Sequence, residues 1–156
     1  MVAATYTSSV WLNNPKANQF GNNTVSSTVN WTAAGSVGDI VLLAKVPNGA
    51  KIVDFYEYHT SGQTAAAISF GFDRGIASGG AGNASCLLAS GAIATMNRMT
   101  LAASPNTANG PITISISDTD PIHYVSLQAK AESGTFTITV AISFCLTYRV
   151  DGPDPA

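Results

Sequence analysis

The chain has 156 residues, of which 46% are hydrophobic and only 10% are charged, and its formal net charge is −2. This length suits one domain with a sizeable core. The seven Lys and Arg residues are scattered from Lys16 to Arg149, whereas nucleic-acid binding requires clustered cations. We therefore expect neither a nucleic-acid partner nor electrostatic binding to a membrane.

A soluble domain usually has roughly 25% charged residues, so small neutral polar groups are expected to cover much of the surface of this chain. Such a surface packs readily against other proteins, because few charges have to be desolvated. A secreted β-domain with a face rich in Ser and Thr is the alternative with the same composition.

The first residues, MVAATYTSSVWLNNPK, contain no basic start followed by an apolar run, which a signal peptide requires. No apolar segment approaches the roughly 20 residues of a membrane-spanning helix. We therefore expect synthesis in the cytoplasm, with Cys86 and Cys145 as buried free thiols and a disulfide as the alternative. The spacing of the two cysteines matches no zinc-binding pattern.

The first segment, residues 1–27, is rich in Asn, Ser and Thr and has no clean strand period beyond Tyr6–Leu12. We interpret it as an N-terminal arm or as an edge segment of the domain. Its large apolar side chains are candidate contacts with a neighbouring protein: Trp11, Leu12 and Phe20. An arm of this kind is expected to provide affinity for a partner and little stability to the fold.

Alternating apolar residues predict β-strands through residues 28–150, which we assign to one β-sandwich domain. The alternating sets are Val29, Trp31 and Ala33; Ala66, Ile68, Phe70 and Phe72; Ile112, Ile114 and Ile116; and Val125, Leu127 and Ala129. Residues 40–46 are almost continuously apolar, as in a central strand. Residues 85–100 are ambiguous between a strand and a short helix.

The stretch KVPNGAKIVDFYEYH, from Lys45 to His59, contains the turn signal Pro47-Asn48-Gly49 between two apolar runs. This pattern predicts a β-hairpin.

The clearest strand is TFTITVAISFCLTY, residues 135–148, in which large apolar and small residues alternate throughout. One face is expected to belong to the core: Phe136, Ile138, Val140, Ile142 and Phe144. About eight strands without a repeat period predict an all-β fold, a two-sheet β-sandwich of jelly-roll type. Residues 151–156 are expected to form a flexible tail.

A search for chemistry yields no catalytic, cofactor-binding or metal-binding set. His59 and His123 lie in predicted strands, and no carboxylate or Cys accompanies either at ligand spacing. Asp118 and Asp120 are explained by turn hydrogen bonding, and Asp54 and Glu57 are expected on opposite faces of one strand. We therefore expect a protein that is not an enzyme and binds no cofactor.

One run does resemble a known family: GDIVLLAKVPNGAKIVDFYEYHTSGQTAAAISFGFDR, from Gly38 to Arg74. It is similar to a pattern of strands and turns in small virion structural proteins of tailed bacteriophages, which are capsid decoration (cement) proteins. The resemblance covers about a quarter of the chain and leaves residues 1–27 without a counterpart.

This resemblance implies a β-sandwich that binds the outside of an icosahedral head. Its implied partners are the major capsid protein and further copies of itself, in a homotrimer, and its implied location is the exterior of the virion. Trp11, Leu12 and Phe20 are then candidate capsid or inter-subunit contacts.

Two alternatives remain open. A carbohydrate- or receptor-binding phage domain could use Trp11, Trp31, Tyr56 and Tyr58 as a stacking platform, although alternating aromatic residues also fill cores. A small jelly-roll coat subunit is the other alternative. Coat subunits that package RNA commonly carry a basic N-terminal arm, whereas residues 1–27 contain one cation, Lys16.

Overall fold

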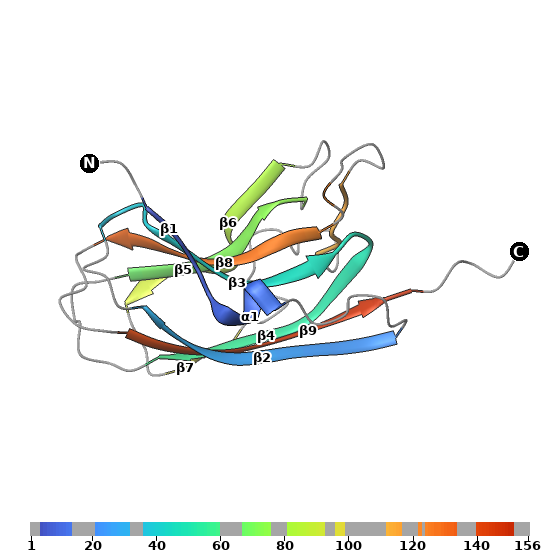
Figure 1. Ribbon diagram of the computed structural model, residues 1–156, viewed down its shortest axis with the longest axis horizontal. Coiled ribbons are helices and arrows are strands. Elements are labelled where there is room, and N and C mark those ends of the chain that lie inside the picture. Colours follow the sequence, from blue (N-terminus) through green and yellow to red (C-terminus); the bar gives the residue numbers. More distant parts are fainter. Residues whose placement is uncertain are drawn as a thin grey trace, which may run out of the picture.

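The computed structural model describes residues 4–13, 21–31, 36–59, 67–75, 81–92, 96–98, 112–116, 122, 124–133 and 140–151. These ranges contain nine strands and one short helix. The strands form two sheets that pack face to face (Figure 1). The predicted all-β, two-sheet sandwich is confirmed.

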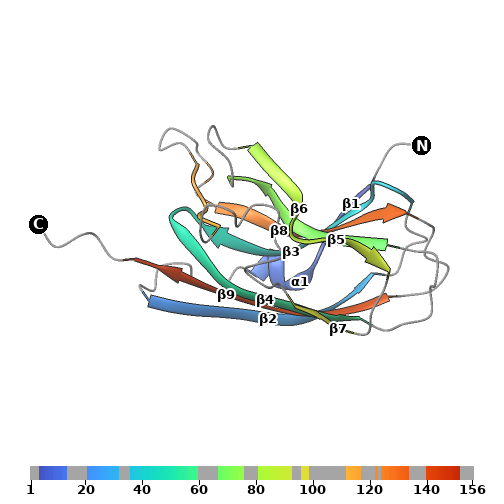
Figure 2. The same ribbon diagram turned by 180° about the vertical axis from the view of Figure 1, so that it is seen from behind.

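The larger sheet has five strands, in the spatial order β1 (Thr5–Thr7), β3 (Ile40–Pro47), β8 (Tyr124–Ser133), β5 (Ala67–Arg74) and β6 (Ala81–Ala92). The smaller sheet has four strands, in the order β2 (Gly21–Trp31), β9 (Val140–Val150), β4 (Ala50–His59) and β7 (Met96–Arg98). Helix α1 (Ser9–Asn13) follows β1. The same two layers are seen from behind in Figure 2.

The strand pairs are nested in the way that defines a jelly roll. The smaller sheet contains the pairs β2–β9 and β4–β7, and the larger sheet contains β3–β8 and β5–β6. All four pairs are antiparallel, so the chain from β2 to β9 is a double ribbon wrapped into two sheets. Strand β1 is an addition to this plan, since it pairs with β3 in parallel.

The stretch from Lys45 to His59 is not a β-hairpin, and that prediction is wrong. Strand β3 pairs with β8 in one sheet, whereas β4 pairs with β9 in the other. The turn at Asn48 and Gly49 therefore carries the chain from one sheet to the other. A tight turn specifies a change of direction, but it does not decide whether the two flanking strands share a sheet.

Side-chain and backbone hydrogen bonds hold this corner. Gly49 has a φ of 79°, which favours glycine. The Asn48 side-chain oxygen accepts hydrogen bonds from the backbone N–H groups of Gly49 at 3.1 Å and of Ile116 at 2.9 Å. The predicted alternation of Ile112, Ile114 and Ile116 is confirmed by their burial, and this segment bridges to the start of β4.

Where the structure describes the ambiguous residues 85–100, they belong to strands β6 and β7, and no helix is present in those described parts. Two glycines allow β5 and β6 to approach each other. A Cβ at Gly71 would overlap the backbone of Asn83 and Ala84, and a Cβ at Gly82 would overlap the backbone of Asp73. The register of this pair shifts twice, between Ile68 and Phe72.

The N-terminal residues in the described ranges belong to the sandwich. The Asp39 carboxylate, which is buried, accepts hydrogen bonds from the backbone N–H groups of Ala4 and Ser36, each at 2.8 Å, and so ties β1 to the start of β3. Strand β2 begins at Gly21, so the expected boundary between residues 27 and 28 falls inside a strand. Residues 14–20 and the tail after Asp151 lie outside the described residues.

The core lies between the inner faces of the two sheets. On β9, Ile142, Phe144, Leu146 and Tyr148 are buried, as the alternation predicts. Phe136, Ile138 and the side chain of Val140 lie outside what the structure describes.

Replacing Ile142 by Ala is expected to lower the free energy of unfolding by about 2–5 kcal/mol, because the lost burial is followed by a cavity. Replacing Ser143 by Ala is the matched control and is expected to cost little, since its hydroxyl faces outward and shares a 2.7 Å hydrogen bond with the exposed Thr28. Urea unfolding measures both. Equal losses at the two positions would contradict burial of a single face.

Candidate interaction surfaces

The described residues contain no group of three or more His, Cys, Asp or Glu side chains that could hold a metal ion. His123, Asp118 and Asp120 lie outside these residues. Asp54 is half-exposed and Glu57 is buried, which confirms that they face opposite sides of β4. In the described part of the chain no helix has the length and apolarity needed to cross a membrane.

One ionisable pair is nevertheless buried in the sandwich. The carboxylate of Glu57 lies 2.6 Å from Nδ1 of His59, and the two side chains are 0% and 2% exposed. Their partners across the strand pair are Phe144 and Ile142, so the surroundings on β9 are apolar. The expectation that no carboxylate accompanies His59 is wrong, and the signal was the spacing of two residues, which places side chains on one face of a strand.

Both cysteines are free thiols, as expected, but only Cys86 is fully buried. Burial raises the pKa of Cys86 to about 12, so its thiol stays protonated and unreactive at neutral pH. Cys145 is only half-buried, and it lies on the outer face of the smaller sheet between Ser26 of β2 and Tyr56 of β4.

Helix α1 is fixed to the larger sheet by Trp11. The indole N–H of Trp11 donates a 3.1 Å hydrogen bond to the hydroxyl of Ser126. The ammonium group of Lys45 lies 4.4 Å from the centre of the Trp11 ring and 4.8 Å from that of Tyr124, a pair of cation–π contacts. Ser8 caps the helix, because its hydroxyl accepts a hydrogen bond from the Trp11 backbone and donates one to the carbonyl of Leu43.

The structure describes two of the three candidate contact residues, Trp11 and Leu12, and these two differ in exposure. Trp11 is half-buried and anchored, whereas the adjacent Leu12 is 61% exposed. Phe20 lies outside the described residues. The anchored helix therefore presents the large apolar side chain of Leu12 to solvent.

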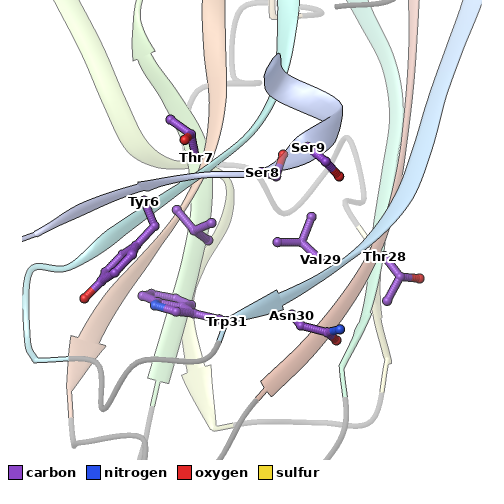
Figure 3. Close-up of a pocket in the computed structure, with 9 residues that line it drawn as sticks. Tyr6, Thr7, Ser8, Ser9, Thr28, Val29, Asn30 and Trp31 are labelled. Carbon is purple, nitrogen blue, oxygen red and sulfur yellow. The ribbon is translucent and has the colours of Figure 1, made fainter. Parts of the chain in front are cut away.

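An open pocket of about 320 Å³ lies between β1, the start of α1 and β2 (Figure 3). Its lining residues are Tyr6, Thr7, Ser8, Ser9, Thr28, Val29, Asn30, Trp31 and Val41. The rings of Tyr6 and Trp31 are 6.5 Å apart and tilted by 56°. None of the lining side chains is Asp, Glu, Lys or Arg, so the polar groups that line the pocket are neutral.

The four aromatic residues proposed as a stacking platform are not brought together. Trp31 is a core residue with 2% exposure, and Trp11 packs on the larger sheet. Tyr56 and Tyr58, in contrast, are 42% and 50% exposed on the outer face of the smaller sheet.

That outer face is composed mainly of short neutral side chains. On β2 it presents five exposed residues: Asn22, Thr24, Ser26, Thr28 and Asn30. Charged groups gather toward one end, where Asp151 lies 2.6 Å from both Lys51 and Arg149. Hydrogen bonding by Lys51 and the nearby Arg149 charge lower the pKa of Asp151. The remaining face has little charge to desolvate and little side-chain entropy to lose when it meets another protein.

Comparisons with known proteins place this fold among phage capsid structures. No protein-family model and no curated protein sequence matches the chain. A chain from the structure of the capsid of Ralstonia phage GP4 matches with a TM-score of 0.62 and 17% identity, over 97% of this chain and 100% of that one. A chain from the cyanophage Pam1 capsid asymmetric unit matches with a TM-score of 0.57 and 14% identity, over 87% and 91% respectively.

These likenesses establish a shared fold along nearly the whole chain. Because the coverage is almost complete in both directions, the matched chains have lengths similar to that of this protein. The jelly roll is therefore the entire match and not one part of a larger neighbour.

Replacing Glu57 by Leu is expected to lower the free energy of unfolding by about 3–5 kcal/mol, because it leaves the His59 side chain buried without its partner. The double variant Glu57→Leu/His59→Leu is expected to lose less than Glu57→Leu alone, since no polar group is then stranded. Urea unfolding of the four proteins in this cycle gives the coupling. Strictly additive losses would show that the pair does not act as a unit.

Proposed function

We propose that this protein is a non-enzymatic bacteriophage capsid decoration (cement) protein, which binds the outside of the head through the major capsid protein and stabilises it. The observation that carries the proposal is the fold shared over 97% and 87% of the chain with chains from two phage capsid structures. Among the described residues, no metal-binding cluster points to an alternative chemistry.

The surface supports a role in a lattice. With 10% charged residues, the protein can form broad contacts without extensive desolvation of charges. A shell carries many copies, so a modest contact area in each copy adds up to a large effect on the whole particle.

The attachment site that we propose is centred on α1. Trp11 holds the helix on the larger sheet, and Leu12 projects from it with 61% exposure. An exposed leucine on a rigidly held helix can enter an apolar recess with little loss of conformational entropy. Phe20 is proposed as a further contact on the basis of the sequence.

The two alternatives have less support. Of the four aromatic residues that could stack on a sugar, Trp31 is 2% exposed and Trp11 packs on the larger sheet, so only Tyr56 and Tyr58 offer accessible rings, and the pocket does not include them. A coat subunit that packages RNA commonly has a basic arm, and residues 1–27 contain a single cation, Lys16.

We further propose that the protein is a homotrimer, because a three-fold site on an icosahedral head is matched most simply by a three-fold ligand. Native mass spectrometry of dilute protein is expected to show three chains. A monomer at micromolar concentration, both free and in extracts of decorated heads, would refute the trimer.

Purified protein is expected to co-sediment with empty heads that lack it and to raise the temperature at which those heads break. The variant Leu12→Asp is expected to bind at least roughly tenfold more weakly, since a charge would have to enter an apolar contact. Val37→Asp is the matched control, because Val37 is 60% exposed in a turn of the same protein. Failure of the unmodified protein to bind would exclude decoration, and normal binding by Leu12→Asp would place the attachment site elsewhere.

A further inference from the structure

Each of the two sheets has two edge strands, β1 and β6 in the larger sheet and β2 and β7 in the smaller one. These four strands differ in how well they are protected against pairing with another chain. Strands β1 and β7 are each three residues long, and the register of β6 with its neighbour is broken by shifts. Strand β2 has eleven residues and an unbroken register with β9 from Gly21 to Trp31. Figure 1 shows β2 at the margin of its sheet, and among the described residues its only strand partner is β9.

Natural edge strands usually carry a device that prevents association, such as a charged residue, a proline or a bulge. The sequence of β2, GNNTVSSTVNW, contains no charge and no proline, and its register contains no bulge. A long, regular and neutral edge is suited to receive a further strand through main-chain hydrogen bonds. Among the edges that the structure describes, β2 is thus the one on which such pairing is least opposed.

The exposed side chains of β2 indicate which strand fits. Along the outer face they read Asn22, Thr24, Ser26, Thr28, Asn30, an order that is the same in both directions about Ser26. If a second copy of β2 lies antiparallel with Ser26 opposite Ser26, Thr24 faces Thr28 and Asn22 faces Asn30. Thr–Thr pairs across strands are favourable, and no like charges meet anywhere along the contact.

We propose that β2 is a two-fold contact between copies of this protein, in which two β2 strands pair antiparallel, centred on Ser26. The contact joins two four-stranded sheets into one sheet of eight strands. It uses the smaller sheet, whereas Trp11 fixes α1 to the larger one. On a head decorated by trimers, a use that rests on the proposed function, the two-fold contact would join neighbouring trimers.

One strand pair buries a modest area, so this association is expected to be weak in dilute solution. Copies held close together on a shell have a high effective concentration, which would favour the pairing. A test must therefore trap the contact without depending on tight binding.

Cross-linking through Ser26→Cys provides such a test. Residues directly opposite in an antiparallel pair have Cα atoms about 4.5–5.5 Å apart, within the range of a disulfide. The variant is made together with Cys145→Ser, because Cys145 lies opposite Ser26 on β9 of the same chain and would compete for it. Under mild oxidation, this protein is expected to form a covalent dimer on a non-reducing gel.

The register is tested by two further variants in the same background. Thr24→Cys alone is expected to cross-link poorly, whereas a mixture of Thr24→Cys and Thr28→Cys proteins is expected to give the dimer. Ser133→Cys, at the exposed end of β8, is the control for random collision. Cross-linking of Ser26→Cys no faster than that of Ser133→Cys would overturn the proposal, as would equally fast cross-linking of Thr24→Cys alone.

Charges added beside Ser26 test the same geometry in a second way. Thr24→Lys/Thr28→Lys places like charges opposite each other and is expected to slow the Ser26→Cys cross-link roughly tenfold. Thr24→Lys/Thr28→Glu places opposite charges there and is expected to retain the original rate or exceed it. Equal rates in the two variants would contradict the pairing. Head binding is measured separately, so loss of cross-linking and loss of decoration are distinguishable.

Discussion

The position of β9 between β2 and β4 is the constraint on which the rest of the sandwich depends. Its inward side chains, from Ile142 to Tyr148, are buried, while the residues between them face outward. Because side chains in a strand alternate between faces, a slip of one residue would expose the whole inward row. The registers of β2 and β4 against β9 therefore determine which side chains those two strands present to solvent.

A second set of contacts ties the beginning of the chain to this framework. Asp39 binds the backbone before β1, Ser8 caps α1, and Trp11 packs with Lys45 on the larger sheet. The contact between Ala4 and Asp39 joins residues 35 positions apart, and that between Trp11 and Ser126 joins residues 115 positions apart. They convert a segment with the composition of an arm into an edge strand and a short anchored helix, so that Leu12 is held in a fixed position.

The proposed contact of α1 with the shell and the proposed pairing of β2 with a second copy both depend on the small number of charged residues in this protein. A protein with few ionic groups relies on hydroxyl and amide side chains to remain hydrated, and these groups can be transferred to a protein interface if their hydrogen bonds are replaced. The structure places α1 on one sheet and the edge of β2 on the other. The proposed attachment residue, Leu12, and the proposed pairing residues of β2 are therefore different, and an open pocket lies between the start of α1 and β2.

The sequence by itself determined the class of the fold and most of the strands after residue 28, because these depend on the local period of two and on turn residues such as Asn48 and Gly49. The start of β2 at Gly21 and the strands β6 and β7 were not determined, since their residues show no clear alternation. It also identified the buried face of β9 at Ile142 and Phe144 before any pairing was known. Which strands share a sheet was decided only by the tertiary structure. Pairing joins distant segments, such as Thr24 and Thr147, which are 123 positions apart, and the energy of such a pair is not encoded in either segment alone. For that reason the pattern from Lys45 to His59 predicts a hairpin, although the segment is a corner between the two sheets. The position of β2 at the edge of the described sheet could likewise be recognised only after β9 was placed beside it, since an edge is defined by the neighbours of a strand.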